Sequence, residues 1–121
     1  MELYVGGAYQ GKLQFVLSEH PELTEENVYD CAGAPEAVPD PGQTIWNHFH
    51  LLFRRLTEDE LEAFMEGFDG IVICDEVGSG IIPMDKEEEA FRERVGRQLV
   101  MLAKRAGRFE RVVCGIGIRL K

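Results

Sequence analysis

Residues 3–12 read Leu-Tyr-Val-Gly-Gly-Ala-Tyr-Gln-Gly-Lys, an apolar run that ends in glycine and precedes a helical pattern. This order predicts a strand, a phosphate-binding loop and the start of a helix. Backbone N–H groups between Gly6 and Gly11 can surround phosphate oxygens, while Lys12 and the positive end of the helix add charge. A glycine-rich turn without a ligand is the alternative. The nucleotide-binding residues predicted here are Gly6, Gly7, Ala8, Tyr9, Gln10, Gly11, Lys12 and Leu13.

Leu13 departs from this loop pattern. The residue after the lysine is normally Ser or Thr, whose hydroxyl group ligates Mg²⁺. A leucine offers no oxygen, whereas the backbone N–H groups and Lys12 do not depend on that side chain. We therefore expect GTP or ATP to bind, with weakened magnesium-dependent chemistry.

Length and charge restrict the class of protein. A chain of 121 residues forms one domain, residues 1–121, with a core of its own. Thirteen basic against 22 acidic residues give a net charge of −9, which argues against nucleic-acid binding. No apolar run reaches the length of a membrane span, and no N-terminal targeting pattern is present. Cys31, Cys74 and Cys114 lack the short spacing of zinc ligands and are expected to be buried thiols in a cytoplasmic protein.

Apolar spacing predicts the remaining elements. Glycine and proline residues make 32–43 a loop. Helices are expected over 12–20, 45–56, from the Thr57 capping box onward, and 86–106 after Asp85; strands are expected over 27–31, 70–74, 109–114 and 118–121. This alternation predicts a three-layer α/β domain with a mostly parallel sheet and an antiparallel C-terminal edge strand.

Asp75 and Glu76 directly follow the apolar strand at 70–74. In a parallel sheet, the ends of this strand and of the first strand lie at the same edge. Asp75 and Glu76 are therefore predicted near Lys12 as ligands of Mg²⁺, with Lys12 and Glu76 as candidate catalytic residues. The alternative is that either carboxylate only caps the next turn.

A longer pattern begins at the same two acidic residues. The matching segments are Asp-Glu-Val-Gly-Ser-Gly-Ile-Ile-Pro at 75–83, Phe-Arg-Glu at 91–93, Gly-Arg at 96–97 and the Gly-Ile-Gly tail at 115–117. In order and spacing they resemble the bifunctional adenosylcobinamide kinase/adenosylcobinamide-phosphate guanylyltransferase family. The resemblance implies a P-loop transferase of cobalamin biosynthesis, a homo-oligomer, and Val77 and Gly78 in the nucleotide site.

The middle of the chain departs from that family. Residues 18–69 are too few for the family's middle strands, and no histidine aligns with its guanylylated nucleophile. His20 is expected to cap a helix, and His48 and His50 to point to different sides of a helix. Trp46 and Phe49 are expected in the core rather than against a flat ligand.

Three interpretations remain open at this point. The favoured one is a nucleotide-binding protein of the kinase/guanylyltransferase type. The second is a non-catalytic regulatory or partner subunit that binds a nucleotide or a corrinoid. The third is a structural α/β module without a ligand.

Overall fold

The computed structural model describes residues 1–34, 37–76 and 85–121. The helices are α1 (Lys12–Glu19), α2 (Glu58–Met65) and α3 (Lys86–Arg105), with short 3₁₀ helices η1 (Glu25–Asn27) and η2 (Phe49–Arg54). The strands are β1 (Glu2–Gly6), β2 (Val28–Asp30), β3 (Ile45–Asn47), β4 (Ile71–Asp75), β5 (Arg108–Val113) and β6 (Ile116–Arg119). None of the helices described is both long and apolar enough to cross a membrane.

The strands form one sheet in the order β2-β3-β4-β1-β5-β6. All neighbouring strands are parallel except β6, which runs antiparallel to β5 at the edge. This confirms the predicted fold class. Strand β1 is central and pairs with β4 in a register that sets Gly6 opposite Asp75.

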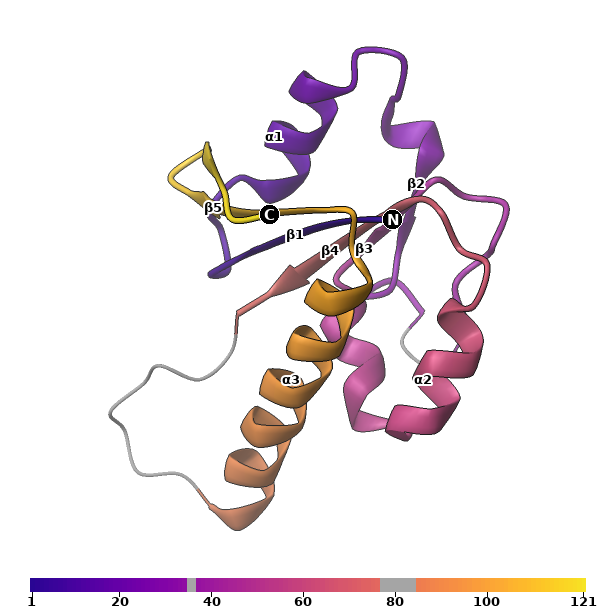
Figure 1. The fold of residues 1–121 in the computed structure, drawn as a ribbon, viewed down its shortest axis with the longest axis vertical. Coiled ribbons are helices and arrows are strands. Elements are labelled where there is room, and N and C mark those ends of the chain that lie inside the picture. The colour runs from indigo at the N-terminus through magenta and orange to yellow at the C-terminus, as the bar shows by residue number, and fades with distance from the viewer. Residues whose placement is uncertain (35–36, 77–84) are drawn as a thin grey trace.

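Helices cover both faces of the sheet, as Figure 1 shows, with α1 on one side and α2 and α3 on the other. The continuous apolar run of β1 follows from this arrangement. Leu3 and Val5 belong to the core cluster that includes Val95 and Leu102 of α3, whereas Tyr4 packs with Val16 of α1.

The helix predicted over 45–56 is wrong. Its first residues form β3, which is hydrogen-bonded between β2 and β4, and the helical part is the short η2. Ile45 and Trp46 are buried in different core clusters, on opposite faces of the sheet, and this double burial overrides the helical spacing. Residues 18–69 hold two short strands, the predicted β2 and the unpredicted β3.

The other helices begin and end near their predicted positions. Thr57 forms the predicted capping box with Glu60, and Asp85 accepts a hydrogen bond from the N–H of Glu88. At the end of α1, His20 Nδ1 lies 2.9 Å from the carbonyl oxygen of Val16, as expected of a cap.

Two of the three cysteines are buried as predicted. Burial raises the pKa of Cys31 to about 12 and also raises that of Cys74. Cys114 is exposed in the turn between β5 and β6, so the prediction of a buried thiol is wrong there.

Candidate functional site

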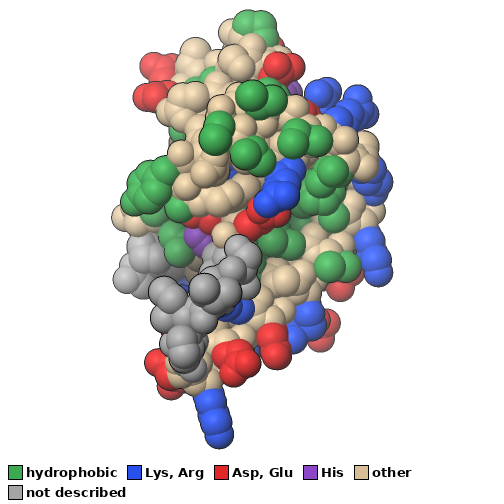
Figure 2. Space-filling model, turned by 90° about the vertical axis from the view of Figure 1, so that its left-hand side faces the viewer, with side chains coloured by type: hydrophobic (Ala, Val, Ile, Leu, Met, Phe, Trp, Pro, Cys, Tyr) green, Lys and Arg blue, Asp and Glu red, His purple; other side chains and the backbone are tan. Residues whose placement is uncertain are grey.

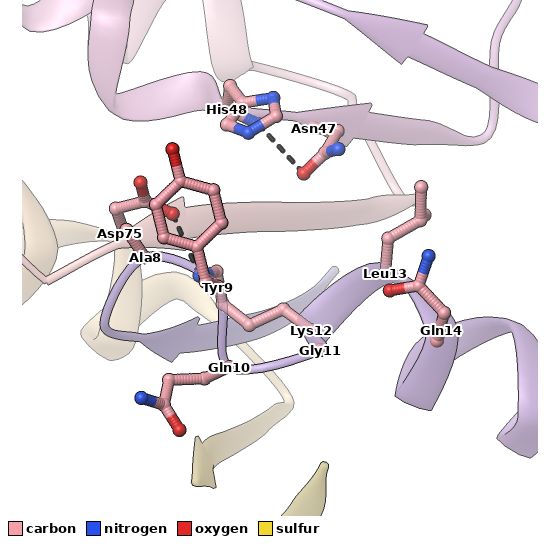
Figure 3. A pocket seen from close by; sticks show the side chains of 10 residues that line it. All are labelled: Ala8, Tyr9, Gln10, Gly11, Lys12, Leu13, Gln14, Asn47, His48 and Asp75. Atoms are coloured by element: carbon pink, nitrogen blue, oxygen red, sulfur yellow. Dashed lines mark hydrogen bonds and ion pairs between the residues drawn. The ribbon is translucent and has the colours of Figure 1, made fainter. Parts of the chain in front are cut away.

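A cavity of about 370 Å³ opens at the edge where β1, β3 and β4 end. Figure 2 views the molecule from this side, and Figure 3 shows the cavity from close by. The predicted phosphate-binding loop, Gly6 to Lys12, is called the glycine loop below. The lining residues come from this loop, the start of α1, the end of β3 and the end of β4: Ala8, Tyr9, Gln10, Gly11, Lys12, Leu13, Gln14, Asn47, His48 and Asp75. The predicted loop and Asp75 therefore meet at one place.

Lys12 is the cation of this cavity, and its side chain is only 7% exposed. Its ammonium group donates a hydrogen bond to the carbonyl oxygen of Gly7 at 2.7 Å and forms an ion pair with Asp75 Oδ1 at 2.8 Å. An ammonium group has three N–H donors, so one remains for a ligand. The loop is folded around the lysine it precedes.

The start of α1 supplies further donors. Gly11 precedes the helix in the left-handed conformation, with φ of 78°, and no side chain caps the helix. The first N–H groups of a helix have no acceptor within it, and they carry its positive end. Thr57 and Asp85 accept N–H groups in the first turns of α2 and α3. No side chain does so for α1, whose first three residues, Lys12 to Gln14, line the cavity.

Glycine is required at Gly6, where the loop leaves β1. A Cβ atom at this position would clash with the carbonyl oxygen of Val112 in β5. Together with the left-handed conformation of Gly11, this contact explains both glycines that bracket the predicted phosphate loop.

Asp75, which is paired with Lys12, also contacts His50. Its backbone N–H donates to His50 Nδ1 at 3.1 Å, and its Oδ2 lies 3.7 Å from His50 Nε2. Burial lowers the pKa of His50 to about 4, the carboxylate of Asp75 opposing that shift. His50 is therefore neutral near pH 7, and the charges of Lys12 and Asp75 balance each other.

Asn47 and His48 complete the cavity on the side opposite the loop (Figure 3). Asn47 Oδ1 accepts the backbone N–H of His48 at 3.0 Å, and His48 Nδ1 lies 2.7 Å from Asp30 Oδ1. The prediction that His48 and His50 diverge on a helix is wrong: His48 precedes η2 with φ of 56°, and the two ring centroids lie 6.1 Å apart. The sequence does not point to Asn47, because the apolar spacing over 45–56 predicts a helix where β3 ends.

Glu76 lies beside the cavity without lining it. Its carboxylate contacts the guanidinium group of Arg111 in β5 at 3.2 Å. The other two predicted residues of this segment, Val77 and Gly78, lie outside the residues that the structure describes.

The donor set fits a protein-held magnesium ion poorly. Leu13 has no oxygen, Asp75 Oδ1 is bound to Lys12, and Asn47 Oδ1 already accepts an N–H group. Within the ranges described, no group of three or more His, Cys, Asp or Glu side chains is arranged to hold a metal ion. The cavity combines the N–H groups at the start of α1 with an ammonium group paired to the Asp75 carboxylate, and the donors of the loop and helix are chemistry suited to an anion.

The chain matches the model of a known protein family. The model of the cobinamide kinase/cobinamide phosphate guanyltransferase family matches residues 44–120, which is more than half of the chain. Comparison with curated proteins gave no significant match. The matched range contains β3, β4 and the hairpin of β5 and β6, while the glycine loop precedes it.

Proposed function

Because the chain belongs to the cobinamide kinase/cobinamide phosphate guanyltransferase family, we propose that it binds GTP or ATP with the phosphates in the loop Gly6–Lys12. The observation that carries this proposal is the buried ammonium group of Lys12 beside the uncapped start of α1. The single domain would act in the cytoplasm, in cobalamin biosynthesis. The resemblance also assigns Val77 and Gly78 to the nucleotide.

In the proposed complex the phosphate oxygens accept N–H groups of the loop and of the first turn of α1. The third donor of Lys12 adds a charged hydrogen bond. Neither interaction needs a metal ion. Binding of the phosphates therefore tolerates Leu13, although the family activity implies a magnesium-bound nucleotide.

Catalysis is proposed to be weak. A leucine replaces the hydroxyl group that would orient Mg²⁺, and Glu76 is paired through Oε2 with Arg111, which competes with a catalytic or metal-binding role. These two observations also favour the second candidate, a non-catalytic nucleotide- or corrinoid-binding regulatory or partner subunit. Turnover of GTP or ATP with a corrinoid acceptor distinguishes the two candidates. The homo-oligomer that the resemblance implies is measured separately by light scattering.

A thermal titration with GTP, GDP, ATP and ADP tests the proposed binding. A ligand that binds only the native state at 100 times its Kd stabilises it by about 2.7 kcal/mol. For a domain of this size, this corresponds to a rise in Tm of roughly 10 °C. The rise is expected with EDTA as well as with Mg²⁺. Unchanged melting at millimolar nucleotide would favour the structural module.

Leu13→Ser is expected to make nucleotide affinity magnesium-dependent, with Mg²⁺ strengthening binding by about tenfold, because the new hydroxyl group can ligate the ion. Leu13 packs against the core cluster of Tyr4 and Val16, so the variant should also lose about 1–2 kcal/mol of stability. Isothermal titration of GTP with and without Mg²⁺ measures the effect. Leu13→Ala is the matched control, because it loses the same packing without gaining an oxygen. Strong magnesium dependence in the native chain would contradict this account of Leu13.

A further inference from the structure

The turn between β5 and β6 lies against the glycine loop, although the two are separated by most of the chain. Cys114 and Gly115 form this turn with φ values of 50° and 75°. Positive φ at both positions is typical of a two-residue hairpin. Both residues donate a hydrogen bond from their backbone N–H group to Gln10 of the glycine loop.

Gln10 receives these two hydrogen bonds through different atoms. Its side-chain Oε1 accepts the N–H of Cys114 at 2.7 Å, and its backbone carbonyl oxygen accepts the N–H of Gly115 at 2.8 Å. Figure 3 shows the Gln10 side chain directed away from Asn47 and His48, although the residue lines the cavity. The amide group is therefore turned toward the hairpin rather than toward a ligand.

The contact to the turn orients the next peptide group of the loop. The C=O and N–H groups of a trans peptide point in opposite directions. With the carbonyl group of Gln10 fixed on the hairpin, the N–H of Gly11 points away from the hairpin. The loop is also supported at its first residue, since Gly6 lies against the carbonyl oxygen of Val112 in β5.

The conformation held in this way is a strained one. Tyr9, next to Gln10, has φ of 61° and a fully exposed side chain, so no packing of its ring compensates for the left-handed backbone. A strained loop that must receive phosphate keeps its shape only if its surroundings fix it. The two bonds from the hairpin to Gln10 supply such a fixed point.

We propose that Gln10 is a positioning residue, through which the turn Cys114–Gly115 holds the loop in its phosphate-binding shape before the ligand arrives. This inference rests on the proposed function. Preorganisation of this kind strengthens binding because the ligand does not have to order the loop.

Gln10→Met tests the proposal, because methionine has a similar length and lacks the oxygen acceptor. GDP is the probe, titrated calorimetrically, and hydrogen exchange at the Cys114 amide is the second measurement. Gln10→Met is expected to weaken GDP binding by about tenfold and to remove the protection of the Cys114 amide. Gln43→Met is the matched control, because Gln43 precedes β3 at the amino ends of the strands, away from the cavity. It should change neither GDP affinity nor protection of the Cys114 amide.

Gln10→Glu provides the rescue, because a carboxylate oxygen can accept the same N–H group. It should restore protection of the Cys114 amide, and its GDP affinity is compared at high salt, where the added charge is screened. Native affinity in Gln10→Met would overturn the role of Gln10 and leave the proposed function standing. Failure of the native chain itself to bind GDP would overturn both.

Discussion

Lys12→Met is expected to weaken GTP binding by about 100-fold. The variant removes the only ammonium group that lines the cavity within the described residues, while methionine retains the buried stem of the side chain. Hydrogen bonds to charged groups contribute about 1.5–3 kcal/mol. The upper part of this range corresponds to the stated loss. Isothermal titration at constant salt measures it.

Asp75→Asn is the matched control for that experiment, with the opposite expected result. It removes the carboxylate that neutralises Lys12 and would repel phosphate, and an amide can still accept a bond from the ammonium group. GTP affinity in the absence of Mg²⁺ should therefore rise. The double variant Lys12→Met/Asp75→Asn leaves no unpaired carboxylate, so it separates lost binding from lost stability. GTP affinity in Lys12→Met equal to that of the native chain would contradict a phosphate site at this lysine.

Trp46→Ala should lower the free energy of unfolding by about 3–5 kcal/mol, the usual cost of removing a buried aromatic ring. Trp46 is 1% exposed and stacks on Phe68, with ring centroids 3.6 Å apart, and on Phe64 at 5.1 Å. Its indole N–H also donates to the carbonyl oxygen of Asp40. Urea unfolding followed by circular dichroism measures the loss, since the variant contains no tryptophan.

Trp46→Phe is the control for that experiment. It keeps an aromatic ring in the stack and loses only the indole N–H, so its loss should be much smaller than that of the alanine variant. A loss below about 1 kcal/mol in Trp46→Ala would contradict the central place of this ring in the core. The predicted place of Trp46 and Phe49 in the core is confirmed by their burial.

The sequence predicted the two parts of the site that depend on local patterns. A strand that ends in glycine and a strand that ends in acid must place Gly6 and Asp75 at one edge of a parallel sheet, and the register sets them opposite each other. The contact between Lys12 and Asp75 follows from that topology. The sequence does not show that this contact ties the Asp75 carboxylate to the lysine instead of leaving it free to ligate a metal ion. Only the side-chain geometry shows this.

The segment from Ile45 to Leu56 could not be assigned correctly from its spacing. Ile45, Phe49, Leu52, Phe53 and Leu56 recur at helical intervals, but the first of them is buried in a strand. Residues distant in sequence determine that Ile45–Asn47 forms a strand, because β3 is hydrogen-bonded between β2 and β4. The spacing therefore places Asn47 and His48, at the end of that strand, on the wrong element.

The central position of β1 has a consequence for the kinetics of folding. Leu3 is aligned with Val72 on one side and with Phe109 on the other, so the first strand is completed only by segments far along the chain. Closing such long loops precedes the stabilising contacts, and domains with many non-local pairings, parallel sheets among them, fold more slowly than helical bundles. Because the glycine loop rests on the hairpin of β5 and β6, affinity for phosphate should be among the last properties to appear during refolding.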